Sequence, residues 1–178
     1  EIRTRAPHVA PLEPRSDYER RIVEARRRRL IYPYEIIRML TGMGQGQAPV
    51  GVGPASELTV GRFEEFDLDP QAQTPRAASV EGRPFGKNSC GIVFGIITTP
   101  TPKVPEGMSR VLVLSDPTLG MGSLAAPECD RLIAALDLAE ERQLPLEWIP
   151  VSSGARIAMD SGTENLDATA RVVRRIVH

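Results

Sequence analysis

Two unbroken apolar runs limit what this chain can fold into. GIVFGIITT occupies residues 91–99, RVLVLSD occupies residues 110–116, and LEWIPV at residues 146–151 is a shorter third run. A strand with one face in water alternates apolar and polar residues, so unbroken β-branched runs predict a sheet covered on both faces. A chain of 178 residues is long enough to build that sheet and its covering layers as one domain.

Two segments have the helical spacing needed to cover the sheet. One lies between the second and third strands, and the other follows the third. Their apolar positions are Leu132, Ile133, Leu136 and Ala139 in the first segment, and Leu166, Val172, Val173, Ile176 and Val177 in the second. The order strand, strand, helix, strand, helix predicts an α/β fold.

The N-terminal part differs from the rest in charge. Residues 1–29 contain nine arginines and five acidic residues. Ser16 followed by Glu19 forms a capping box, which predicts that SDYERRIVEARRRRLIYPYEIIRML is helical from Ser16 onward. The arginine run at 26–29 has three interpretations: a phosphate site, a solvated face, or a contact with a neighbouring chain.

Glycine- and proline-rich stretches divide the chain further. We expect residues 1–40 to be a helical lead-in or linker, residues 41–57 a glycine-rich loop, and residues 58–178 a lobe that continues beyond the chain. The loop lacks the preceding strand and the third glycine of a dinucleotide-binding fingerprint. The residue pattern predicts a strand at 58–69, a connector at 70–87 and a turn region at 99–108.

Composition argues against several classes of function. A net charge of −1 gives no general attraction to nucleic acid, and no apolar run approaches the length of a membrane span. His8 and His178 lie near the two ends, so a Ser-His-Asp triad is not expected. Cys90 and Cys129 lack zinc-ligand spacing, which favours free thiols, no metal site, and a cytoplasmic location.

Small residues gather at two predicted strand ends. SDPTLGMGS occupies residues 115–123 and PVSSGARIAMDSG occupies residues 150–162. Ligands of α/β sheets bind beyond the carboxyl ends of strands, so two such loops lying side by side would make a site lined by backbone donors. The best candidate donors are the N–H groups of Ser153, Gly154 and Ala155, and a plain tight turn is the alternative. Asp116 and Asp160 are either bases or turn carboxylates.

Residues 81–173 resemble the N-lobe of the carboxyltransferase component of biotin-dependent acyl-CoA carboxylases. The matching pieces are GRPFGKNSCGIVFGII (82–97), SDPTLGMGSL (115–124) and VSSGARIAM (151–159), in that order. Upstream, LIYPYEIIRMLTG and LTVGRFEEFDLD are similar to the lead-in of the fused multidomain type. The resemblance implies a crotonase-like fold of ββα units. It also implies an enzyme that moves the carboxyl group of carboxybiotin to the α-carbon of an acyl-CoA through a thioester enolate.

The resemblance also assigns roles to residues. Ser153, Gly154 and Ala155 would form the backbone oxyanion hole, and Arg156 would orient the site or the transferring carboxylate, or pair with an acid. The remaining residues would bind substrate. Gly120, Met121, Gly122 and Ser123 would shape the acyl-CoA pocket, while Asn88, Ser89 and Cys90 would lie on a strand beside the CoA channel or serve packing.

The implied partners lie outside this chain. They are a carboxyltransferase C-lobe, a biotin carboxyl carrier domain and a biotin carboxylase domain, which would hold the ATP and Mg. A homo-oligomer is expected, with no nucleic acid and no membrane as partners, and the isolated chain should be inactive. Two alternatives are a biotin-dependent acyl-CoA decarboxylase, which uses the same lobe, and a non-catalytic assembly segment suggested by the arginine-rich N-terminal residues.

Overall fold

The computed structural model describes residues 14–42, 60–159 and 161–178. Within these residues the sheet has five strands in the order β2-β1-β3-β4-β5. The strands are β1 Arg62–Leu68, β2 Ala77–Ser79, β3 Ile92–Thr101, β4 Val104–Ser115 and β5 Leu146–Ile149. The helices are α1 Asp17–Arg27, α2 Pro33–Thr41, the short 3₁₀ turn η1 Gly120–Gly122, α3 Ala126–Arg142 and α4 Glu164–Val177.

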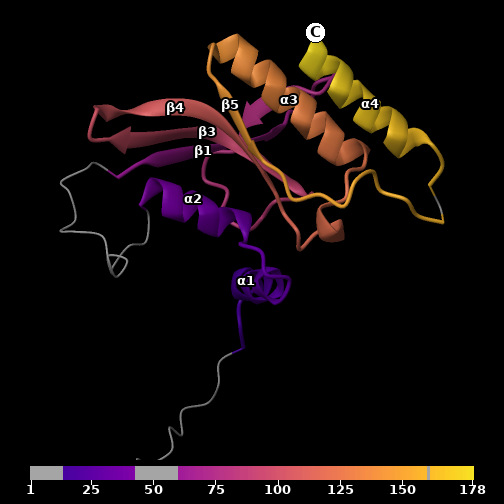
Figure 1. Cartoon of the computed structure of the whole chain (residues 1–178), viewed down its shortest axis with the longest axis horizontal. Helices are drawn as coiled ribbons and strands as arrows, with labels where there is room; N and C mark the ends of the chain where they lie inside the picture. The colour runs from indigo at the N-terminus through magenta and orange to yellow at the C-terminus, as the bar shows by residue number, and fades with distance from the viewer. Residues whose placement is uncertain (1–13, 43–59, 160) are drawn as a thin grey trace, which may run out of the picture.

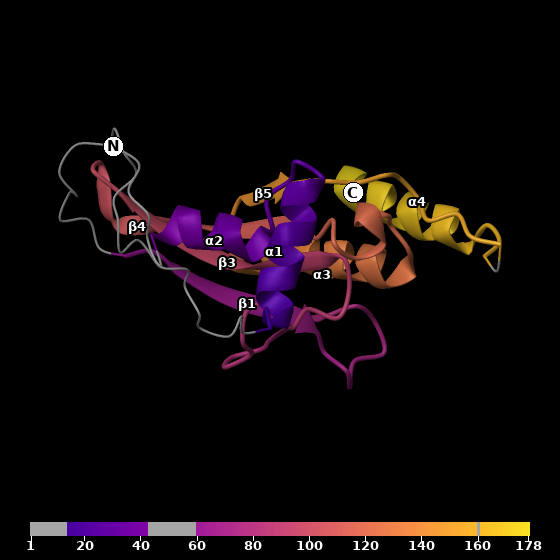
Figure 2. The same cartoon turned by 90° about the horizontal axis from the view of Figure 1, so that it is seen from below.

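Helices cover the sheet on both faces. Figures 1 and 2 show α3 and α4 on one face, and α1 and α2 on the other. The chain forms antiparallel pairs β1–β2, β1–β3 and β3–β4, whereas β5 returns after α3 to pair parallel with β4. The predicted α/β class and double coverage are confirmed.

The two covering layers explain the unbroken apolar runs. Successive side chains of a strand point to opposite faces. In β3, Phe94 is buried against the α3 and α4 side, while its neighbour Val93 is buried against α1 and α2. In β4, Val111 is likewise buried on the α3 and α4 side, and Leu112 on the α1 and α2 side. If one face of these runs met water, every second residue would be polar. In residues 92–94 of β3 and 111–115 of β4 every residue is buried.

The N-terminal segment forms two helices, so the prediction of one helix is wrong. The predicted capping box of Ser16 and Glu19 is present, and α1 begins there. After α1 the chain turns through Arg29, whose φ is +59°, and α2 starts at Pro33. Proline suits the first turn of a helix but not its interior, and Tyr32 and Tyr34 become fully buried on either side of it.

Three local predictions also need correction. Residues 99–108 form most of a hairpin rather than a turn region, because β3 reaches Thr101 and β4 starts at Val104, with the register shifting between Thr99 and Thr101. The connector at 70–87 contains the short strand β2. Residues 88–90 lie in a bend before β3, not on a strand. Proline and glycine mark these segments as turns, but bulges and strand ends accept both residues.

Other sequence predictions concern membrane spans, metal sites and the two cysteines. No described helix is both long and apolar enough to cross a membrane. No group of three potential metal ligands occurs among the described residues. Cys90 and Cys129 are free, as predicted, and both are buried. Residues 43–57 of the predicted glycine-rich loop, and Asp160, lie outside the described residues.

Candidate functional site

The two loops that follow β4 and β5 lie side by side, which meets the condition that the sequence set for a shared site. Because these strands are parallel, their carboxyl ends meet at one edge of the sheet. Leu124 donates its N–H to the carbonyl of Gly154 at 2.9 Å, and Arg156 donates its N–H to the carbonyl of Leu124 at 2.7 Å. These bonds join the first loop, residues 116–125, to the second loop, residues 150–163.

The first loop makes its closest approach through a left-handed turn. Gly120, Met121 and Gly122 have φ angles of 55°, 56° and 72°. A Cβ on Gly122 would lie 2.1 Å from the carbonyl oxygen of Val151, so only glycine permits this approach. Met121 has a left-handed backbone conformation, which is strained for a residue with a side chain, and its side chain is largely exposed. The turn therefore fits closely against the second loop.

Asp116 is the buried anchor of the first loop. Its carboxylate is 0% exposed. One oxygen accepts hydrogen bonds from the N–H of Thr118 at 2.9 Å and the hydroxyl of Thr118 at 2.6 Å, and the other accepts from Nδ2 of Asn88 at 2.9 Å. A carboxylate occupied in this way holds a turn together, so the turn interpretation of Asp116 fits the geometry better than a base.

The second loop presents its backbone to the surface. Gly154 has a φ of +93° and open space where a Cβ would stand. Its N–H is taken by Oγ of Ser152 at 3.0 Å. The N–H groups of Ser153 and Ala155 have no acceptor among the described residues. Two of the three predicted donors are therefore available to a ligand, and the third is held within the loop.

Arg156 combines a fixed backbone with a free side chain. Its N–H is bonded to Leu124, and its carbonyl accepts a hydrogen bond from Nδ2 of Asn165 at 3.0 Å. Asn165 is buried at the start of α4. The Arg156 side chain is exposed and forms no ion pair with the described residues. The alternative, in which Arg156 pairs with a nearby acid, is therefore not seen among them. A guanidinium placed like this is suited to bind a carboxylate or another anion.

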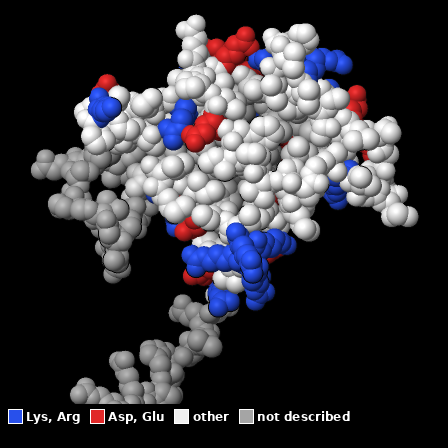
Figure 3. Space-filling view, in the orientation of Figure 1, with Lys and Arg blue, Asp and Glu red and all other residues white. Residues whose placement is uncertain are grey.

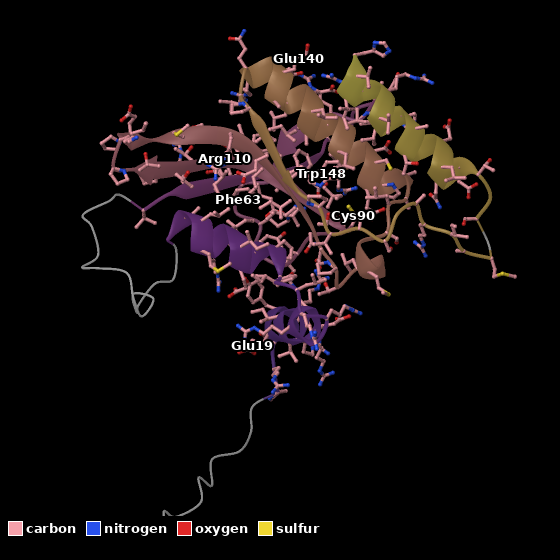
Figure 4. All side chains as sticks on the ribbon, viewed as in Figure 1. Glu19, Phe63, Cys90, Arg110, Glu140 and Trp148 are labelled. Atoms are coloured by element: carbon pink, nitrogen blue, oxygen red, sulfur yellow. The ribbon has the colours of Figure 1, made fainter. Side chains whose placement is uncertain are left out.

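The bend before β3 is engaged with the protein rather than open to a ligand. Asn88 is buried, and its amide bonds Asp116 and the carbonyl of Cys90. The hydroxyl of exposed Ser89 accepts a hydrogen bond from Nη2 of Arg131 at 3.1 Å. Cys90 lies inside the molecule (Figure 4), and burial raises the pKa of its thiol to about 11. These contacts favour the packing interpretation of the bend.

Sequence reasoning missed several residues that build the site. Leu124 joins the two loops, Asn165 fixes the carbonyl of Arg156, and Arg21 of α1 donates a hydrogen bond to Oδ1 of Asn88 at 2.8 Å. Leu124 could have been identified from the sequence, because it is the last residue of the SDPTLGMGSL motif. Arg21 and Asn88 are 67 residues apart. No local spacing indicates that contact.

The arrangement of sheet and loops is a crotonase-like α/β fold. The structure is similar to the β subunit of Pseudomonas aeruginosa geranyl-CoA carboxylase, with a TM-score of 0.55, 17% identity, and coverage of 89% of this chain and 24% of that one. At this identity the likeness shows the fold. No family model matches the sequence.

Sequence relatives are found among acetyl-CoA carboxylases. The Schizosaccharomyces pombe acetyl-CoA carboxylase is 36% identical over 74 residues, or 42% of this chain. Acetyl-CoA carboxylase 1 of Arabidopsis thaliana is 25% identical over 160 residues, or 85% of this chain. The matched regions are 3% and 7% of those two proteins, so this chain corresponds to a small part of each.

Proposed function

We propose that this chain is the N-lobe of a carboxyltransferase in a biotin-dependent acyl-CoA carboxylase. The observation that carries the proposal is the pair of joined loops: among the described residues, the N–H groups of Ser153 and Ala155 have no acceptor, and the adjacent Arg156 has no acidic partner. The similarity to acetyl-CoA carboxylases and to the geranyl-CoA carboxylase β subunit supports it.

Each part of the site has a task in this chemistry. The N–H groups of Ser153 and Ala155 would bind the thioester oxygen as it gains negative charge in the enolate. Arg156 would hold the transferring carboxylate. Gly120, Met121, Gly122 and Ser123 would form the wall against which the acyl-CoA lies. Donors and positioning stabilise such an enolate without a histidine or an ionised side-chain base from this lobe.

The proposal assigns the remaining parts of the reaction to other domains. Biotin supplies the activated carboxyl group and would arrive on a carrier domain outside this chain. A C-lobe would complete the pocket, and a separate biotin carboxylase domain would use ATP and Mg. We further propose the fused multidomain arrangement, a homo-oligomer and a cytoplasmic location, with the lead-in at 1–40 and the lobe at 58–178.

One position separates a backbone role from a side-chain role. Ser153→Pro removes the N–H, whereas Ser153→Ala removes only the hydroxyl. In the complete carboxylase, we expect Ser153→Pro to lower kcat/KM for acyl-CoA about a hundredfold and Ser153→Ala to change it less than threefold. Carboxylation that survives Ser153→Pro unchanged would contradict the oxyanion-hole role.

A further inference from the structure

The arginine-rich helix α1 contacts the first loop directly, although the chain separates them by about ninety residues. Nη1 of Arg28 donates to the carbonyl of Pro117 at 3.1 Å. Nη1 of Arg21 donates to Oδ1 of Asn88 at 2.8 Å and lies 3.5 Å from Oδ2 of Asp116. Both arginines therefore reach the residues that begin the first loop.

The spacing of these arginines places them on one face of α1. Arg21 lies in α1 and Arg28 is its C-cap residue, seven positions or about two helical turns later, so both side chains reach the side of the helix that meets the loop. Arg26 and Arg27 lie elsewhere on the helix and are exposed. Figure 3 shows the basic side chains gathered over α1 on the outside of the molecule. The helix thus has a solvent-facing cationic side and a loop-facing cationic side with different roles.

The loop-facing contacts converge on a buried charge. Asp116 is fully buried, and Arg21, with a side chain 26% exposed, is the cation nearest to it. Asn88 bridges the two, because it accepts from Arg21 and donates to Asp116. A buried carboxylate needs such partners, and removing one leaves the others poorly compensated. The orientation of Asp116, and of the turn that it anchors, therefore depends on α1.

We propose that α1 belongs to the active-site scaffold, with Arg21 and Arg28 as positioning residues that hold the first loop where it meets the second loop. Asn88 and Asp116 transmit this constraint to the left-handed turn at 120–122. The proposal rests on the proposed function only where it predicts an effect on the kinetics of acyl-CoA carboxylation. The structural part concerns the loop itself.

The test compares Arg21→Gln with Arg26→Gln in the complete carboxylase, followed by hydrogen–deuterium exchange of the loop amides and by steady-state kinetics. Arg21→Gln is expected to speed exchange at residues 118–124 at least tenfold while α3 is unchanged. It should also lower kcat/KM for acyl-CoA about tenfold, mainly through KM, because a misplaced wall weakens substrate positioning. Arg26→Gln should change neither, and Arg21→Lys should restore part of both.

The outcomes separate the two proposals. If Arg21→Gln leaves exchange at 118–124 unchanged, α1 does not position the loop and the inference is overturned. If it loosens α3 and the loop equally and lowers the melting temperature, its role is general stability and the inference is also overturned. If exchange changes only in the loop but the complete wild-type carboxylase, with its C-lobe and biotin domains, carboxylates no acyl-CoA, the proposed function fails while the positioning role stands.

Discussion

The loops that follow β4 and β5 meet at one edge of the sheet but are held in opposite ways. The first loop is fixed by side chains: buried Asp116 bonds Asn88 and Thr118, and Arg28 reaches the carbonyl of Pro117. The second loop is largely exposed and is joined to Leu124 by backbone hydrogen bonds. A site needs both, because one wall must keep its place while the other offers free groups to a ligand.

The largest difference should appear when the same substitution is made in each loop. Gly122→Ala places a Cβ 2.1 Å from the carbonyl oxygen of Val151 and adds left-handed strain, so we expect it to lower the free energy of unfolding by about 3 kcal/mol. Gly154→Ala adds only the strain, at about 1 kcal/mol. Urea denaturation followed by fluorescence of Trp148, the single tryptophan, measures both. Equal losses would remove the contrast between the loops.

The anchor of the first loop can be tested by itself. Asp116→Asn keeps the shape but turns an amide donor toward a donor of Asn88 or Thr118, so stability should fall by about 2 kcal/mol. Asp167→Asn is the matched control, because Asp167 is exposed on α4 and forms no side-chain hydrogen bond with the described residues. The control should change stability by less than about 0.5 kcal/mol. A similar small effect at Asp116 would mean that the first loop does not depend on its buried carboxylate.

The second loop has a smaller side-chain anchor in Asn165. Asn165→Ala leaves the carbonyl of Arg156 without its partner and should cost about 1 kcal/mol in the same denaturation experiment. Thr163→Ala, at a helix start with no side-chain cap bond, is the control and should be nearly neutral. A cost at Asn165 that matches the cost at Asp116 would show that the two loops are held equally firmly.

Acid should weaken the support behind the first loop. Burial raises the pKa of Asp67, but the hydrogen bonds from Arg83 and Leu68 and the charge of Arg131 outweigh it and hold the pKa below 3.8. Ionised Asp67 therefore stabilises the fold above that pH, and its contribution is lost as the pH falls through the range below 3.8. Arg131 links Asp67 to Ser89 in the bend beside Asn88.

The pH effect is measured as the difference in urea midpoint between pH 7 and pH 3. Arg131→Gln should make this difference smaller than in the wild type, because Asp67 loses one of its cations. Arg142→Gln should leave the difference unchanged, since Arg142 is exposed at the end of α3 and has no ion pair among the described residues. A pH dependence that is the same in all three proteins would exclude Asp67 as its source.

Local signals in the sequence predicted the parts of the fold that depend on local forces. The capping box at Ser16 and the apolar strands around Phe94 and Val113 follow from neighbouring residues alone. The hairpin through Pro100 and Pro105 was mistaken for a turn, because cross-strand pairing overrode the preference of proline. The break before Pro33 was missed although proline is a local signal for it, whereas the burial of Tyr32 and Tyr34 against the sheet is seen only in the folded chain.

The candidate site divides in the same way. The two loops could be located from strand order and small residues, so Gly122 and Ser153 could be singled out early. That the loops lie side by side is seen in the folded chain. Which N–H groups are free could not, since it depends on the rotamer of Ser152. The link from Arg21 to Asp116 spans 95 residues and leaves no periodic trace in the sequence. Distant side-chain pairs of this kind become visible only in the folded chain.

The parallel pairing of β5 with β4 has a consequence for the order of folding. The β1–β3 and β3–β4 pairs join antiparallel strands, and the hairpin of β3 and β4 needs only a short turn. β5 can pair only after the chain has crossed back through α3, so its contacts close a longer loop than those of the β3–β4 hairpin and should form after them. Leu124 and Gly154 then meet at a late stage. Protease resistance near Ser153 should therefore develop after that of the hairpin, which makes this loop a reporter of completed folding.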